Sequence, residues 1–145
     1  MLKKQYFENR RVIASGREAD VRATGSVSDY DALMKERARQ YGLDWRLLAA
    51  QAYQESRFDP KAKSWVGAQG LFQVMPATGQ EMGFTDLEDP GQGVHAGAQY
   101  MAKLIDSFDP RIPFKQRVRF ALASYNAGRG HVEDARLLAA EQGLD

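Results

Sequence analysis

The chain of 145 residues contains no cysteine. A disulfide framework, a thiolate metal site and a cysteine nucleophile are therefore excluded. No run approaches the roughly 18 consecutive apolar residues that a membrane-spanning helix needs. Residues 1–11 carry basic side chains but no apolar stretch between them, so this segment is not a secretory signal peptide.

A strong excess of charge is also lacking, because the formal net charge is +1. We therefore expect no nucleic-acid partner, since nucleic-acid-binding domains are usually strongly basic. Hydrophobic residues make up 43% of the chain and charged residues 27%, a balance typical of globular proteins. The length suits one domain with a single core, without internal repeats, and we expect a monomer.

Two regions differ in their periodicity. Residues 1–28 show no sustained pattern and contain several Gly and Ser residues, which predicts a linker or docking segment. Residues 29–145 are predicted to form the domain. Because residues 143–145 read as a helix stop followed by missing chain, and because no signal peptide is present, we expect a piece of a longer exported precursor.

The first helix of the domain is expected to begin at a capping residue, either Ser28 or Asp29. It should run to about Tyr41. Gly42 then offers the left-handed conformation with which many helices end.

The second helix is expected from Trp45 to about Ser56, with Asp44 as its cap, and its apolar surface places it centrally in the core. In residues 59–75 the hydrophobic pattern is short and is interrupted by glycines, which predicts a structured loop or small hairpin. Further helices are predicted from Pro76 to Gly83, from about Val94 to Pro110 with Met101 in its core stripe, from Phe114 to Gly128, and through Val132, Ala135 and Ala139. The predicted fold class is mainly α.

Glu55 follows Leu48, Gln51 and Ala52 at helical spacing, so its carboxyl should point toward the protein interior. Burial disfavours the charged form and can raise the pKa of a glutamate enough for it to donate a proton near neutral pH. No lysine or arginine lies three or four positions away to oppose this effect. The ordinary alternative is a helix-end glutamate that caps a turn or pairs with a nearby cation.

Four separated segments of the sequence form a recognisable series. They are Glu55-Ser56, Ser64-Trp65-Val66-Gly67, Gly70-Leu71-Phe72-Gln73-Val74-Met75-Pro76 and Ser124-Tyr125-Asn126-Ala127-Gly128. Their order and spacing resemble the signature of the family 1 lytic transglycosylases, enzymes of lysozyme-like fold that cleave the glycan strands of peptidoglycan. The wider pattern is similar to the C-terminal catalytic domain of a membrane-bound member of that family. The resemblance makes Glu55 the catalytic acid.

The resemblance also implies the residues that bind substrate. The Ser64 hydroxyl would orient and polarise the sugar, while Gln73 and Met75 would line the sugar-binding groove. Tyr125 would support the catalytic acid and the sugar at the reaction centre, and Asn126 would hold its loop. Gln73 is difficult to explain as a structural residue, because a buried amide needs several hydrogen-bond partners.

One residue departs from the family pattern, since Phe72 stands where methionine is common, and this change should affect packing more than chemistry. His95 and His131 have no second ligand at metal spacing and are interpreted as surface or helix-end histidines. Neither a metal site nor a cofactor is predicted.

Glycoside cleavage usually requires two carboxylates, yet no second one is chosen here, because the acidic residues after Glu55 lie in turns or exposed runs. A lone acid suits a sugar whose own 2-acetamido oxygen can stabilise the anomeric carbon. The resemblance implies cleavage between N-acetylmuramic acid and N-acetylglucosamine. Glu55 would first protonate the leaving oxygen and then remove the proton of the 6-hydroxyl, which gives a 1,6-anhydro product.

Two other functions stay open at this point. A hydrolase of the goose-type lysozyme class would also use Glu55 but would need a carboxylate to direct a water molecule. A glycan-binding module would hold the strand without cutting it. The resemblance further implies that the protein works in the periplasm or cell envelope, with any membrane association made by regions outside this chain.

Overall fold

The computed structural model of the protein describes residues 25–127. This part contains five α-helices: α2 (Asp31–Tyr41), α3 (Trp45–Ser56), α4 (Pro76–Glu81), α5 (Pro90–Asp106) and α6 (Phe114–Ala127). Within the same residues, β pairing is confined to two isolated antiparallel bridges, Lys63 with Gln69 and Gln69 with Val74. The predictions of a mainly α fold and of a structured loop after the second helix are confirmed.

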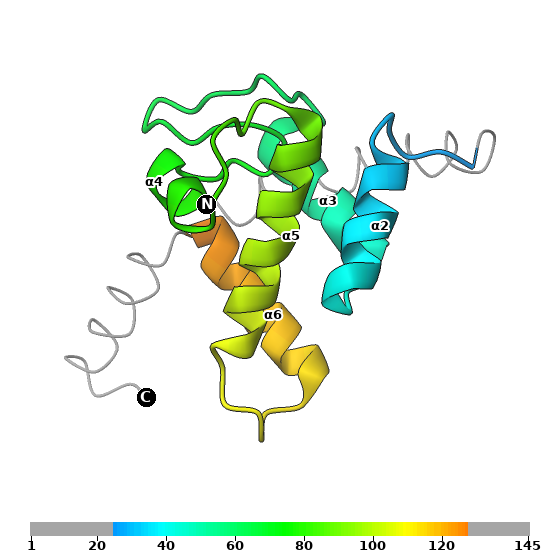
Figure 1. The fold of residues 1–145 in the computed structure, drawn as a ribbon. Coiled ribbons are helices and arrows are strands. Elements are labelled where there is room, and N and C mark those ends of the chain that lie inside the picture. Colours follow the sequence, from blue (N-terminus) through cyan, green and yellow to red (C-terminus); the bar gives the residue numbers. More distant parts are fainter. Residues whose placement is uncertain (1–24, 128–145) are drawn as a thin grey trace, which may run out of the picture.

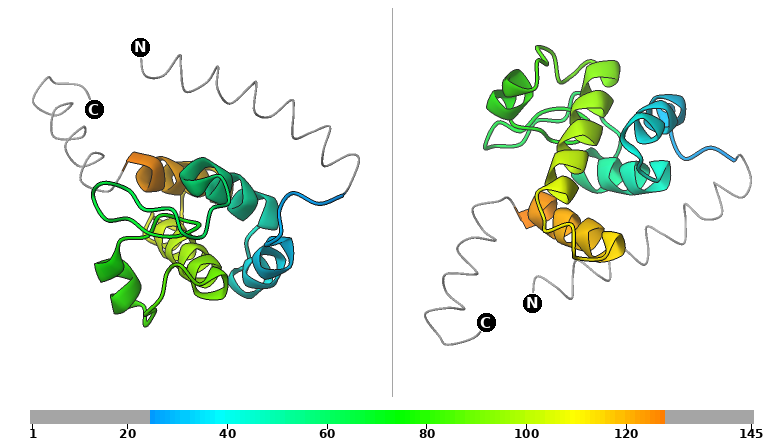
Figure 2. Two further views of the ribbon diagram at one scale, coloured as in Figure 1. Left: turned by 90° about the horizontal axis from the view of Figure 1, so that it is seen from above. Right: turned by 60° about the horizontal axis from the view of Figure 1, so that its bottom comes forward.

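Helix α5 is the centre of the arrangement (Figure 1). It packs against α2 on one side and against α6 on the other, and α2 packs in turn against α3. The long loop of residues 57–75 crosses the top of the molecule and leads to α4, as the turned views of Figure 2 also show. None of the helices within residues 25–127 is both long and apolar enough to span a bilayer.

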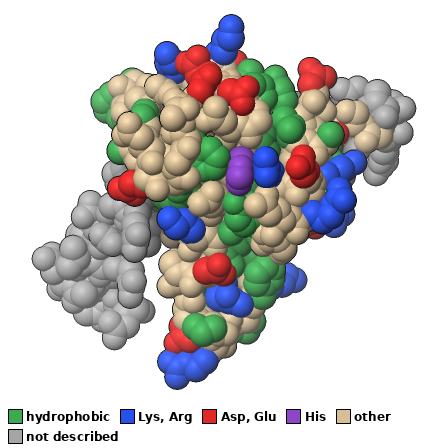
Figure 3. Space-filling view, in the orientation of Figure 1, with side chains coloured by type: hydrophobic (Ala, Val, Ile, Leu, Met, Phe, Trp, Pro, Cys, Tyr) green, Lys and Arg blue, Asp and Glu red, His purple; other side chains and the backbone are tan. Residues whose placement is uncertain are grey.

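The hydrophobic core consists of two clusters. The larger joins α2, α3, the loop and the first half of α5, with Met34, Leu48 and Leu71 fully buried. The smaller lies between α5 and α6 around Met101, as the apolar stripe predicts. Tyr125 packs against both clusters. On the face shown in Figure 3, acidic and basic side chains are interspersed.

The ends of α2 and the start of α3 follow local signals. Gly42 is left-handed with φ 67°, as predicted. The Asp44 side chain accepts a hydrogen bond from the Arg46 backbone N–H at 3.0 Å, which confirms the predicted cap. The start of α2 was predicted too early. The Asp31 carboxylate accepts both the Val27 and the Ser28 backbone N–H groups at 2.8 Å, so the preceding residues form a turn.

Helix α5 begins at Pro90, one turn before the predicted start at Val94. Pro90 occupies the first turn, and Asp89 caps the helix by accepting the Gln92 backbone N–H at 3.0 Å. The apolar stripe begins only after a glycine-rich first turn, so periodicity alone places the start too late. The predicted last helix and His131 lie outside the described residues.

Candidate active site

Glu55 lies in the last turn of α3, on the side of the helix that packs into the core. Leu48 and Ala52, which precede it on this face, are fully buried. Burial raises the pKa of the half-buried Glu55 carboxyl from its ordinary value of 4.5 to about 7. Within the described residues Glu55 forms no ion pair, so the alternative of a pair with Arg57 or Lys61 is not what the structure contains.

Gln51 links Glu55 to helix α6. Its Nε2 donates hydrogen bonds to Glu55 Oε1 and to Asn126 Oδ1, each at 2.9 Å. Gln51 is only 2% exposed. The sequence predicts no role for Gln51, although an amide one helical turn before a carboxylate on the inward face is a signal for such a contact.

Two hydroxyl groups hold successive carbonyls of the loop. Ser56 Oγ donates to Leu71 O at 2.8 Å, and Tyr125 Oη donates to Phe72 O at 2.6 Å. Helices α3 and α6 thereby fix the 71–72 segment beside the end of α3 that carries Glu55. Burial raises the pKa of Tyr125 well above its usual value, and the Glu55 and Tyr100 side chains add to the rise, so the phenol remains a donor.

Ser64 and Gln73 order the loop from within. Ser64 Oγ accepts the Ala68 backbone N–H at 3.0 Å, and the Ser64 backbone N–H donates to Ala68 O at 2.9 Å. Gln73 adopts a left-handed backbone with φ 50°. Its Nε2 donates to Ala62 O and to Gly70 O, each at 2.9 Å, so backbone carbonyls supply partners that are not apparent from the sequence.

The predicted site residues are thus only partly joined by described contacts. Gln51 joins Glu55 to Asn126, and Tyr125 is joined to the loop through Phe72. Met75 is 43% exposed and directly precedes α4.

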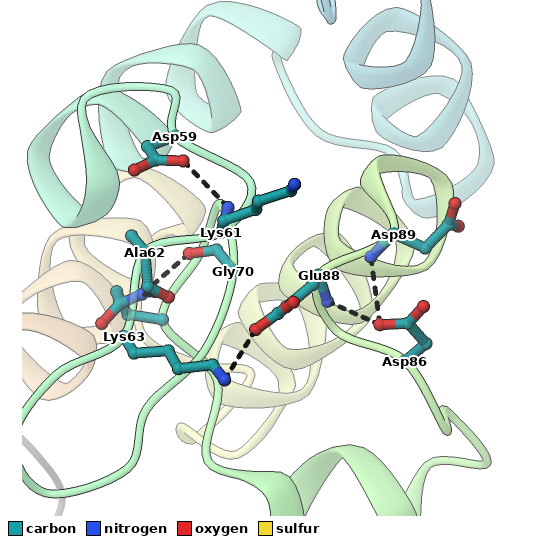
Figure 4. A network of polar contacts seen from close by, with 9 residues as sticks. Asp59, Lys61, Ala62, Lys63, Gly70, Asp86, Glu88 and Asp89 are labelled. Carbon is teal, nitrogen blue, oxygen red and sulfur yellow. Dashed lines mark hydrogen bonds and ion pairs between the residues drawn. The ribbon is translucent and has the colours of Figure 1, made fainter.

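A second set of contacts supports the loop from the segment before α5 (Figure 4). Lys63 Nζ forms an ion pair with Glu88 Oε1 at 3.0 Å, and the Asp86 carboxylate accepts the Glu88 backbone N–H at 3.1 Å. Gly70 packs so closely that a side-chain carbon on it would overlap the carbonyl oxygen of Leu87, and its φ of 82° also favours glycine.

Four of the five acidic residues between Glu55 and α5 serve structural roles. Asp59 accepts the Lys61 backbone N–H at 2.9 Å, Asp89 caps α5, and Asp86 and Glu88 take part in the contacts of Figure 4. Glu81 is exposed at the end of α4. None of these carboxylates has a described contact with Glu55.

His95 is partly exposed, as expected of a surface histidine, and it lies within α5 and not at a helix end. The His95 Nε2 lies 2.8 Å from Tyr41 Oη. The Phe84 ring meets the His95 ring edge-on, with 4.9 Å between the ring centroids. Burial lowers its pKa, and the nearby Arg37 charge lowers it further. It therefore connects α2 to α5. Among residues 25–127, no group of three or more His, Cys, Asp or Glu side chains is arranged to hold a metal ion.

The raised pKa of Glu55 predicts that its ionisation destabilises the fold. Between its ordinary pKa of 4.5 and about 7, the folded state keeps a proton that the unfolded state has lost, so stability falls as pH rises through this range. Glu55→Gln cannot ionise. We expect the free energy of unfolding of Glu55→Gln to equal that of the wild type at about pH 4. At about pH 8 the variant should be more stable by about 1–2 kcal/mol, after allowing for partial solvent exposure.

Denaturant unfolding at the two pH values measures this difference. Glu36→Gln, which changes an exposed carboxylate of α2, is the matched control and should show no such gain. Equal stability of Glu55→Gln and wild type at both pH values would contradict the burial of the Glu55 carboxyl.

Comparison with known proteins places this geometry in a family. A family model described as the Transglycosylase SLT domain matches residues 32–143. Membrane-bound lytic murein transglycosylase F of Desulfosudis oleivorans is 47% identical over 113 residues, which cover 78% of this chain and 25% of that protein. The chain therefore spans about a quarter of the length of this relative.

Two solved structures have a similar fold. An inactive mutant of the lytic transglycosylase Slt from Pseudomonas aeruginosa matches with a TM-score of 0.62 and 31% identity, over 72% of this chain and 18% of that one. The 70 kDa soluble lytic transglycosylase of Escherichia coli matches with a TM-score of 0.60 and 33% identity, over the same shares. The lysozyme-like fold and the resemblance predicted from the sequence are confirmed, and the chain belongs to the Transglycosylase SLT domain family.

Proposed function

We propose that this chain is the catalytic domain of a peptidoglycan lytic transglycosylase, which cleaves the β-1,4 bond between N-acetylmuramic acid and N-acetylglucosamine. The observation that carries the proposal is the half-buried Glu55 with a pKa of about 7, at the end of a core helix in a domain of this family. A carboxyl with this pKa is partly protonated near neutral pH, which a general acid requires.

The reaction proceeds in two proton transfers through the same group. Glu55 gives its proton to the glycosidic oxygen as the bond from that oxygen to the anomeric carbon breaks, and the bonding electrons leave with the oxygen. The 6-hydroxyl of the same N-acetylmuramic acid then bonds to the anomeric carbon, and the Glu55 carboxylate takes its proton. The acid is restored and the product carries a 1,6-anhydro ring.

Among the described residues, no second carboxylate contacts Glu55. This favours formation of the anhydro product over hydrolysis. A hydrolase needs a base or nucleophile on the far side of the sugar ring. Asp59, Glu88 and Asp89 are occupied by a turn, an ion pair and a helix cap. The 2-acetamido oxygen of the substrate would instead stabilise the anomeric carbon.

Contacts of the loop and of α6 support the proposed substrate-binding roles. The Ser64 hydroxyl hydrogen has no acceptor among the described residues, so Ser64 would donate it to the sugar. Met75 would offer its exposed side chain to the glycan, whereas Gln73 would shape the groove through its contacts with the loop backbone. Tyr125 would hold the 71–72 segment, and Asn126 would act on Glu55 through Gln51.

The domain would act at the cell wall, in the periplasm or cell envelope, as part of a longer exported protein. This placement is supported by the relative from D. oleivorans, whose name describes it as membrane-bound and of which the chain covers 25%. Any membrane association would then depend on regions outside this chain.

Digestion of purified peptidoglycan followed by mass spectrometry tests the proposed function. We expect products that carry the anhydro ring and are lighter by one water than hydrolysis products. Products with a reducing end would show a goose-type hydrolase instead. Binding without any cleavage by the chain would show a glycan-binding module.

Tyr125→Phe tests the role of the phenol. Because the hydroxyl donates to Phe72 O, its loss should lower the free energy of unfolding by about 1 kcal/mol while the ring still packs. The kcat should also fall, since the 71–72 segment beside Glu55 loses one of its supports. Thermal unfolding and steady-state kinetics measure the two effects. A lower kcat with unchanged stability would indicate that the phenol acts directly on the sugar or on Glu55.

A further inference from the structure

Gln51 is a polar side chain enclosed in the core beside the proposed catalytic acid. It is 2% exposed, and a buried amide is unfavourable unless its polar atoms are hydrogen-bonded. Its Nε2 has two hydrogens, and the structure provides an acceptor for each, Glu55 Oε1 and Asn126 Oδ1, both at 2.9 Å. The amide nitrogen is therefore held between α3 and α6.

The hydrogen bond to Asn126 supports this orientation of the Gln51 amide. If the Gln51 side chain alone turned over, its carbonyl oxygen would face Asn126 Oδ1, and two acceptors would meet beside a Gln51 side chain that is only 2% exposed, although residue 126 itself is exposed. Gln51 consequently presents a donor, and not an acceptor, to Glu55. The contact comes from a residue 75 positions further along the chain, so it depends on the packing of α6 beside α3.

A donor facing one oxygen of a carboxyl determines where the acidic proton resides. A protonated carboxyl has one hydroxyl oxygen and one carbonyl oxygen. Glu55 Oε1 accepts from Gln51, so a proton on Oε1 would compete with that hydrogen bond. The proton is therefore carried by Oε2.

We propose that Gln51 is a positioning residue that keeps the acidic proton of Glu55 on Oε2 and holds the carboxylate in place after the proton has left. This inference rests on the proposed function, in which Oε2 gives its proton to the glycosidic oxygen and later takes the proton of the 6-hydroxyl. No bond to Gln51 is made or broken. Its hydrogen bond to Oε1 becomes charge-assisted, and therefore stronger, when Glu55 ionises.

The proposal predicts a specific effect of Gln51→Met, which keeps the length of the side chain and removes the donor. The kcat should fall about tenfold to a hundredfold, because the proton is no longer directed at the leaving oxygen, with little change in KM. Since the lost hydrogen bond favoured the charged form, the pKa of Glu55 should rise, and the alkaline limb of the kcat/KM profile should move up by about one pH unit.

Gln116→Met, at an exposed position on α6, is the matched control and should leave both kcat and the pH profile unchanged. A purely structural role for Gln51 would lower the melting temperature of Gln51→Met without moving the alkaline limb. That result would overturn the proposal. Asn126→Ala releases the Gln51 amide from α6 and should move kcat in the same direction by a smaller factor.

NMR of the unsubstituted chain tests the contact without relying on activity. The side-chain amide signal of Gln51 should shift with pH, and the midpoint of this shift should equal that of the Glu55 titration. The shift should vanish in Glu55→Gln. An amide signal that does not follow Glu55 would overturn the proposal, whether or not the chain cuts peptidoglycan. A chain that shows the coupled titration but no anhydro product would overturn the proposed function and leave the Gln51–Glu55 contact supported.

Discussion

Glu55→Gln should abolish the cleavage of peptidoglycan while leaving the fold and glycan binding nearly intact. The amide keeps the shape of the side chain and can still accept the hydrogen bond from Gln51, but it has no acidic proton to donate. A positioned general acid contributes roughly 10²- to 10⁴-fold to a rate, so the residual activity should be at least about a hundredfold below wild type. Release of anhydro products from purified peptidoglycan measures the loss.

Three measurements make this result specific. Glu36→Gln on α2 should cleave like the wild type, because its carboxylate is exposed on another helix. Sedimentation with insoluble peptidoglycan should show that Glu55→Gln still binds, and its melting temperature should be no lower than that of wild type. Wild-type turnover by Glu55→Gln would mean that another group supplies the proton, and the proposed mechanism would be wrong.

The parts of the fold that could be predicted from the sequence depend on local chemistry. Gly42 ends α2 because glycine tolerates the left-handed conformation, and Asp44 begins α3 because its carboxylate reaches the next free N–H. The inward face of Glu55 follows from helical periodicity alone. Each of these inferences requires only neighbours within one or two turns of helix.

The contacts around Glu55 could not be predicted in the same way. The Asn126 side chain reaches Gln51 across 75 positions of sequence, and the Tyr125 hydroxyl reaches Phe72 O across 53 positions. Both contacts depend on how α6 packs beside α3 and the loop, which no periodicity specifies. Gln73 illustrates the same limit, because the carbonyls that accept its amide hydrogens come from the folded backbone of the loop.

Phe72, which stands where the family commonly has methionine, packs against Gly97 of α5, a contact that only the structure reveals. A methyl carbon built on Gly97 would overlap the Phe72 ring, with two of the ring carbons at 2.5 and 2.6 Å. Phe72 is 1% exposed, so the ring has no open space into which it could move. Glycine at position 97 is thus what allows a flat aromatic ring to occupy this place in the core.

Gly97→Ala should therefore lower the free energy of unfolding by about 1–3 kcal/mol, as overpacked cores generally do, although alanine favours the helix by up to about 1 kcal/mol. Activity should fall as well, because Phe72 O accepts the Tyr125 hydroxyl and a displaced Phe72 disturbs the segment beside Glu55. Denaturant unfolding and kcat measure the two effects. Gly91→Ala in the first turn of α5 is the control, since its methyl would meet only the Asp89 carboxylate, at 3.2 Å.

The double variant Phe72→Met with Gly97→Ala tests whether the Phe72 ring causes the losses of stability and activity in Gly97→Ala. Methionine is flexible and could bend away from a new methyl group, so the double variant should be more stable than the sum of the two single changes predicts, by about 0.5–3 kcal/mol. The same double variant should recover part of the lost kcat, because the backbone of residue 72 returns toward its place. Strict additivity of the two changes would show that Gly97 is needed for a reason other than the Phe72 ring.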